Sequence, residues 1–216
     1  MSFLRQKPVL QILTMGSVII NFTIAPVSMI AFPYVLRQNL QVGDNLYGIA
    51  RSLMMTGPII GSLLVSKFMK KYDFKKSIPA LYCICGISFI FAGITVIPNM
   101  FPFGFWVAYI GVIISSFILG ALITMASVIS ITARQKIIPG HMMGRISAVM
   151  STFILSSIPL GQAIMGRMLD KIPAYFCILI FSVLVLMASL ISRLLFKKMI
   201  NQNNILQQTQ FESVSS

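Results

Sequence analysis

Long uncharged runs of mostly apolar residues alternate with short basic segments along the chain. Residues 8–36, 146–166 and 172–192 carry no charge, and residues 45–66 carry only Arg51. A hydrocarbon core of ~30 Å needs about 20 helical residues, so each of these runs can cross a bilayer once. Because backbone polar groups in lipid must pair within their own segment, such runs favour helices. The pattern therefore predicts transmembrane helices.

One run is too long for a single helix. Residues 77–133 form 57 consecutive uncharged positions, and Pro98 and Pro102 lie in the middle of them. Proline lacks the helical N–H and disfavours helix in the residue before it, so the prolines divide this run into two helices. The expected fold is an all-α polytopic membrane protein with six transmembrane helices, at residues 9–35, 45–66, 77–97, 104–133, 144–168 and 173–195.

Composition supports this interpretation and excludes several other classes of protein. The 216 residues are 57% hydrophobic and 10% charged, whereas soluble domains average about 25% charged residues. A soluble enzyme, a nucleic-acid-binding module and a disordered chain are therefore excluded. We expect a short cytoplasmic start at residues 1–8 and a six-helix transmembrane domain at residues 9–198. The polar, low-complexity residues 199–216 are expected to form a disordered cytoplasmic tail.

The basic residues predict the orientation of the chain in the membrane. If the N-terminus is cytoplasmic, only Arg37, Arg51, Arg167 and Lys171 of the 17 basic residues lie at or near the outer side. Lysine and arginine are retained on the cytoplasmic side of membrane proteins. The net charge of +13 therefore predicts a multi-pass protein of the cell membrane with both termini in the cytoplasm, and it does not indicate a nucleic-acid partner.

Residues suited to enzymatic or metal chemistry are few and poorly placed. Cys83, Cys85 and Cys177 form no CxxC pair and have apolar neighbours, which is typical of buried thiols. The four acids and the only histidine lie in loops, in the tail or at a helix end, and they are Asp44, Asp73, Asp170, Glu212 and His141. No zinc-binding spacing is present. We therefore expect no enzyme, no metal site and no cofactor.

Three segments resemble the second half of a drug-efflux transporter of the major facilitator superfamily, specifically the macrolide-exporter type. They are residues 3–10 with Asn21 and Pro26, residues 57–61 with 66–76, and residues 134–139 with 144–146 and 159–161. The second segment includes a cytoplasmic basic loop that carries Lys67, Lys70, Lys71, Lys75 and Lys76. Lys70 and Asp73 replace an acidic residue and a glycine of the family's loop pattern, as is usual in a second-half copy.

The resemblance implies a half-transporter built as a three-plus-three inverted repeat. It implies export of small amphipathic, antibiotic-like compounds by alternating access in exchange for protons, with a second six-helix half as partner. That partner would be the missing N-terminal half. The other interpretation is a non-transporting membrane partner, such as an assembly subunit, or a vestigial fragment of a transporter. A neighbouring gene for six further helices would favour transport.

Polar and small residues within the predicted helices are candidates for a substrate cavity or for helix packing. Gly57 and Gly61 form a GxxxG pattern that allows close approach of a second helix. Proline in a helix leaves a carbonyl unpaired, and such irregular backbone is tolerated only where it faces protein or water. The cavity candidates are Asn21, Pro26, Arg51, Thr124, Ser127 and Gln162.

Two of these assignments keep an alternative. Arg51 lies about 10 Å along its helix at 1.5 Å per residue, so its charge either reaches the outer interface or serves the cavity or a gate. Thr124 and Ser127 belong to a stripe of small residues that is either a helix contact or a cavity wall. The 15 methionines either pack between helices and lipid or provide a flexible apolar pocket.

Overall fold

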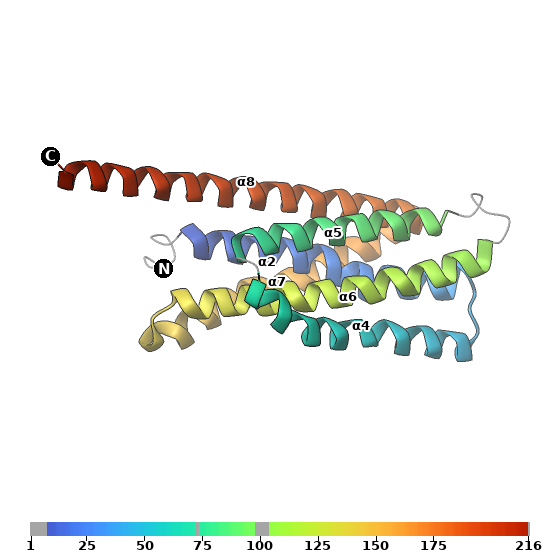
Figure 1. Cartoon of the computed structure of the whole chain (residues 1–216). Coiled ribbons are helices and arrows are strands. Elements are labelled where there is room, and N and C mark those ends of the chain that lie inside the picture. Colours follow the sequence, from blue (N-terminus) through green and yellow to red (C-terminus); the bar gives the residue numbers. More distant parts are fainter. Residues whose placement is uncertain (1–7, 72–73, 98–103, 216) are drawn as a thin grey trace.

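The protein is an elongated bundle of antiparallel helices (Figure 1). The computed structural model describes residues 8–71, 74–97 and 104–215, with side-chain surroundings given for residues 9–67, 77–97 and 104–198. Within these residues, six helices are long and apolar enough to cross a membrane. The predicted all-α fold with six transmembrane helices is thus confirmed.

The first membrane span is composite. It runs from Val9 to Asn39 and consists of α2 (Pro8–Pro26), the π-helical η1 (Val27–Ala31), α3 (Phe32–Tyr34) and the π-helical η2 (Val35–Asn39). Pro26 has no N–H to donate, so one α-helical hydrogen bond is missing there, and the first π-helical turn begins at the next residue, Val27. The span therefore keeps its direction across the bilayer but changes its hydrogen-bond pattern.

The other five spans are regular helices. They are α4 (Asp44–Lys71), α5 (Phe74–Thr95), α6 (Gly104–Ile137), α7 (Met143–Leu169) and α8 (Ala174–Ser215), with a short 3₁₀ turn η3 (Gly140–Met142) before α7. Residues 98–103, with the two prolines that divide the long run, lie outside the described residues. Helices end on either side of them, at Thr95 and Gly104.

Helix α8 differs from the expectation at its C-terminal end. The sequence predicts disorder from residue 199, whereas α8 continues as a helix to Ser215. Its 42 residues contain neither glycine nor proline, the two residues that most strongly interrupt a helix. The polar composition of the tail removes a membrane-spanning signal but provides no stop signal for the helix.

The helix contacts repeat between the two halves of the chain. Helices α4 and α5 pack on α6, and in the same way α7 and α8 pack on α2. Helices α5 and α8 also pack against each other. The first triplet is α2, α4 and α5, and the second is α6, α7 and α8. Because α6 is the third span after α2, the two triplets cross the membrane in opposite directions, as in an inverted repeat. From one edge to the other, one side of the bundle is therefore formed by α4, α6, α2 and α7, in that spatial order. Helices α5 and α8 lie behind α6 and α2.

Glycines make the closest helix contacts at equivalent places in the two triplets. A Cβ on Gly61 of α4 would stand 2.7 Å from the Cα of Ala121 on α6. A Cβ on Gly161 of α7 would stand 2.7 Å from the ring Cγ of Pro26 on α2. Such positions tolerate only glycine without movement of a helix, because the facing atoms belong to backbone or to a proline ring. Gly57 lies in the same way against Phe117 of α6.

Candidate functional site

Helices α4 and α7 are the least buried of the six spans, and their exposed surfaces carry many hydroxyl groups. These are Ser52, Thr56, Ser62 and Ser66 on α4, and Ser151, Thr152 and Ser156 on α7. We call them the exposed hydroxyls. Large apolar side chains lie between them, including Leu63 of α4 and Phe153 of α7. The two helices therefore present a mixed polar and apolar surface.

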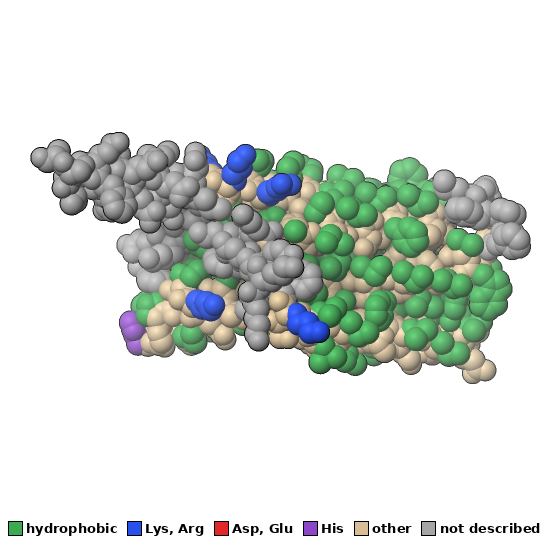
Figure 2. Space-filling view, in the orientation of Figure 1, with side chains coloured by type: hydrophobic (Ala, Val, Ile, Leu, Met, Phe, Trp, Pro, Cys, Tyr) green, Lys and Arg blue, Asp and Glu red, His purple; other side chains and the backbone are tan. Residues whose placement is uncertain are grey.

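Helices α5 and α8 have the opposite arrangement. Apart from the basic residues Arg193, Lys197 and Lys198 of α8, most of their exposed side chains are large and apolar (Figure 2), among them Phe91, Leu190 and Leu194. Their hydroxyls point into the bundle, as the buried residues Ser88, Thr95, Ser182, Ser189 and Ser192 show. Two of these join the helices directly, because Ser182 donates to the Gly86 carbonyl at 3.0 Å and Ser189 to the Pro79 carbonyl at 2.8 Å. This side of the molecule is suited to lipid.

The exposed hydroxyls retain hydrogen-bonding capacity. Thr56 donates to the Leu53 carbonyl at 2.6 Å, and Thr152 donates to the Ala148 carbonyl at 3.0 Å. A hydroxyl has one proton and two acceptor lone pairs, so each oxygen can still accept a hydrogen bond from water or from a ligand N–H or O–H. The surface of α4 and α7 can therefore bind an amphipathic molecule without charged groups.

Pro26 and Gln162 are the two predicted cavity residues that the structure brings to one place. Buried Pro26 packs on Gly161, the neighbour of Gln162 in α7. The Gln162 amide donates to the Met29 sulfur at 3.2 Å, and Met29 lies in η1, with 61% of its side chain exposed. The contact between α2 and α7 thus combines irregular backbone, an amide and an exposed thioether.

The other four cavity candidates are distributed along three helices. Asn21 is half-buried in α2 and donates to the Ser17 carbonyl at 2.8 Å. On α6, Thr124 donates to the Gly120 carbonyl at 2.9 Å, and Ser127 is exposed. Arg51 of α4 is half-buried. These residues all belong to α4, α6 and α2, the helices on the same side of the bundle as the exposed hydroxyls.

The sequence argument missed the two π-helical segments and the exposed hydroxyls. π-Helical turns are rare and occur frequently at functional sites. Pro26 and Pro33, seven residues apart, gave a signal for irregular backbone in the first span. The hydroxyls gave none, because serine and threonine occur in every helix and only packing determines which are buried.

A basic and aromatic cluster closes the turn between the first two spans. The Arg37 guanidinium lies 2.6 Å from the Asp44 carboxylate and 4.2 Å from the centre of the Tyr47 ring. Arg37 also donates to the Val42 carbonyl at 3.4 Å. The Tyr109 hydroxyl fixes the start of α4 from α6 by donating to the Leu46 carbonyl at 2.7 Å. Arg37 is therefore neutralised within this turn.

The basic loop lies largely outside the residues whose surroundings are described. Lys67 is exposed near the end of α4. Lys70, Lys71, Lys75 and Lys76 lie outside the residues whose side chains the structure describes. Across the part of the chain that the structure describes, no three histidine, cysteine or acidic side chains gather as metal ligands would.

Comparison with known proteins agrees with this architecture. The family model described as transmembrane secretion effector, of the major facilitator type, matches residues 1–214. The chain belongs to this family. No curated protein and no solved structure matched it. The chain is thus an integral membrane protein of a transporter family, and its all-helical fold is consistent with one half of the major facilitator fold.

Proposed function

We propose that this chain forms one six-helix half of a secondary transporter that exports small amphipathic compounds, such as drugs of the macrolide type. The observation that carries the proposal is the unequal distribution of hydroxyls, which are mostly exposed on α4 and α7, with Ser157 buried, but mostly buried on α5 and α8. A second six-helix unit, on the same or another polypeptide, would cover the side formed by α4, α6, α2 and α7. The two units would enclose a central cavity.

The residues on this side are suited to an amphipathic solute. The exposed hydroxyls offer acceptors, and side chains such as Met29 and Phe153 offer apolar contact. Methionine is flexible and polarizable, so it can adapt to substrates of different shape. Asn21, Thr124, Ser127 and Gln162 are proposed to line the cavity.

Proton coupling requires a titratable group that the described spans do not supply in their interiors. Asp44 is the first residue of α4, with its side chain 89% exposed, and Asp170 follows the end of α7. We therefore assign the coupling carboxylate to the second unit. Alternating access would then proceed by rocking of the two units in the cell membrane, with both termini of this chain cytoplasmic.

Isosteric exchange of the hydroxyls tests the proposal. The test uses cells of the organism that makes this protein, with its gene deleted. These cells should retain a fluorescent amphipathic dye, and expression of the unchanged chain should restore export of the dye. Thr56→Val with Thr152→Val removes two exposed hydroxyls without changing volume. Since a net hydrogen bond contributes about 0.5–1.5 kcal/mol, loss of both should lower export at least about fivefold at unchanged protein level.

The matched control is Val183→Leu on α8, whose side chain is exposed on the apolar side. It should restore export fully. Equal export by all three proteins would contradict a role for the hydroxyls. If cells with and without the chain retained the dye equally, the chain would instead be a non-transporting partner or a vestigial fragment.

A further inference from the structure

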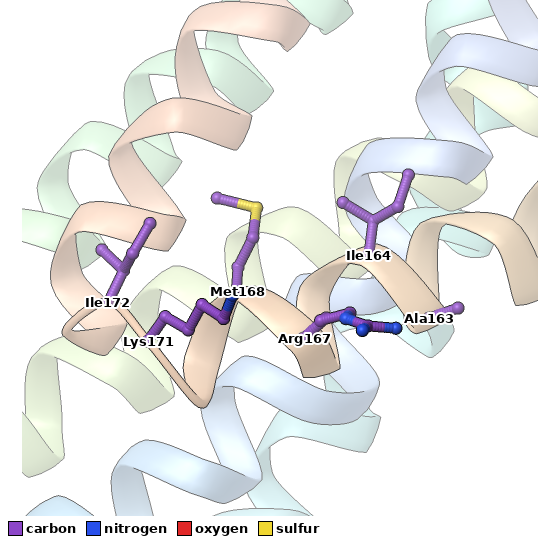
Figure 3. Close-up of a pocket in the computed structure, with 6 residues that line it drawn as sticks. All are labelled: Ala163, Ile164, Arg167, Met168, Lys171 and Ile172. Atoms are coloured by element: carbon purple, nitrogen blue, oxygen red, sulfur yellow. The ribbon is translucent and has the colours of Figure 1, made fainter.

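A shallow pocket of about 400 Å³ lies at the end of α7 and the turn that leads into α8 (Figure 3). Six residues line it, and they are Ala163, Ile164, Arg167, Met168, Lys171 and Ile172. The pocket is open to the surface of the bundle. None of the residues proposed to line the transport cavity lines this pocket, although α7 contributes residues to both.

The lining residues form two adjacent stripes, since residues four apart are neighbours on a helix surface. Ile164 and Met168 of α7 and Ile172 of the following turn make an apolar stripe, and in Figure 3 their side chains point the same way. The other stripe begins with Ala163 and ends with the two cations Arg167 and Lys171. The two cations thus lie beside the apolar stripe, toward the C-terminal end of α7 and in the turn that follows it.

The two cations have no acidic partner in the part of the chain that the structure describes. Arg167 and Lys171 are both exposed, and the salt bridge that the structure does contain joins Arg37 to Asp44. Asp170 lies between them in sequence but does not line the pocket. The positive charge here is therefore available to a ligand, unlike that of Arg37 at the same end of the bundle.

Aromatic residues mark this end of the bundle as a membrane–water interface. Tyr175 and Phe176 follow the pocket directly, with ring centres 5.2 Å apart. Trp106, the only tryptophan, is 56% exposed at the beginning of α6, which lies at this end because the helices are antiparallel. Tryptophan and tyrosine concentrate at the headgroup level of membranes. The cations accordingly lie near lipid headgroups, and the apolar stripe extends toward the hydrocarbon.

We propose that this pocket binds one anionic phospholipid, with its phosphate between Arg167 and Lys171 and an acyl chain along Ile164 and Met168. Guanidinium and ammonium groups are the usual partners of phosphate. Both cations lie at the end of the bundle that the aromatic residues mark as an interface, where they can reach a headgroup phosphate. The site depends on the membrane embedding of α7 and not on the proposed transport function.

Photocrosslinking tests the site on the full chain in mixed micelles. A phosphatidylglycerol with a photoreactive acyl chain should label residues 163–172, as mapped by peptide mass spectrometry. A basic residue near the membrane surface contributes about 1 kcal/mol to anionic-lipid binding, which is about fivefold in affinity. Arg167→Gln with Lys171→Gln should therefore weaken labelling of this segment about 30-fold, and Arg167→Lys with Lys171→Arg should retain most of it.

Controls separate this site from general attraction and from a free-anion site. Lys136→Gln with Arg145→Gln removes two exposed charges at the opposite end of the bundle and should leave labelling of residues 163–172 unchanged. Unlabelled phosphatidylglycerol should compete, whereas phosphatidylcholine and soluble glycerol phosphate should not. Equal labelling by a photoreactive phosphatidylcholine, or full competition by glycerol phosphate, would overturn the proposal, as would absence of label from this segment.

Discussion

At the scale of single residues, the glycines of α4 have contrasting surroundings. A Cβ on Gly57 would stand 3.0 Å from the carbonyl carbon of Phe117, and one on Gly61 would stand 2.7 Å from the Cα of Ala121. No atom lies within 4 Å of a Cβ on Gly48 in the same helix. The same substitution should therefore have opposite effects at these positions.

We predict that Gly57→Ala and Gly61→Ala each lower the melting temperature in detergent, and that the Leu variants reduce the amount of folded protein. Overpacking costs about 1–3 kcal/mol. At Gly48 alanine should leave stability unchanged or raise it by up to about 1 kcal/mol, because alanine favours helix. If all three Ala variants melt together, the close contact between α4 and α6 has no energetic role.

At the scale of elements, the sequence predicted the spans well and the hydrogen-bond pattern poorly. The uncharged runs predicted six helices because lipid disfavours charged side chains and unpaired backbone groups. As an example of the agreement, α5 ends at Thr95, close to the expected residue 97. The π-helical turns after Pro26 depend on which carbonyls the rest of the bundle satisfies. Helix α8 continues to Ser215 because no glycine or proline interrupts it. The polar composition of the tail led the sequence analysis to expect disorder instead.

The candidate site was predictable only in part, for a related reason. Pro26 and Gln162 were recognised as groups that should avoid lipid, and the structure places both at the contact between α2 and α7. Burial decides whether a serine joins helices, as Ser182 does, or lies exposed, as Ser62 does. A single sequence contains the hydroxyls but not the helix pairing that sorts them.

The pairing of α5 with α8 leads to a prediction at this scale. Ser182 and Ser189 donate across the interface to Gly86 and Pro79. Interhelical hydrogen bonds in membranes contribute about 0.6 kcal/mol on average and at most about 2. Ser182→Ala with Ser189→Ala should thus lower the free energy of unfolding in mixed micelles by about 1–3 kcal/mol.

The control for this pair is Thr152→Ala, whose hydroxyl bonds only within α7. It should change the free energy of unfolding by less than about 0.5 kcal/mol, as expected for an exposed substitution. Equal effects of the two variants would mean that the hydroxyls contribute nothing to the pairing of α5 with α8.

At the scale of the whole molecule, orientation follows from the distribution of basic residues, and cysteine labelling measures it. In a chain with Cys83, Cys85 and Cys177 replaced by alanine, we expect His141→Cys to be protected from an impermeant maleimide in intact cells. Gln38→Cys and Lys171→Cys should react. All three positions are exposed, so access depends on the side of the membrane alone. External labelling at position 141 would reverse the predicted topology.

The final prediction is that the 216 residues alone export nothing in an efflux-deficient host. Alternating access needs two units that rock about a shared site, and this chain supplies one inverted repeat pair. A homodimer would add a second wall, but its span interiors would still lack a carboxylate or histidine, since Asp44 and His141 lie at helix ends and are exposed. Coupling requires a group that changes charge during the cycle. Dye export that a protonophore abolishes, measured with no second six-helix unit present, would show that the chain couples protons by itself.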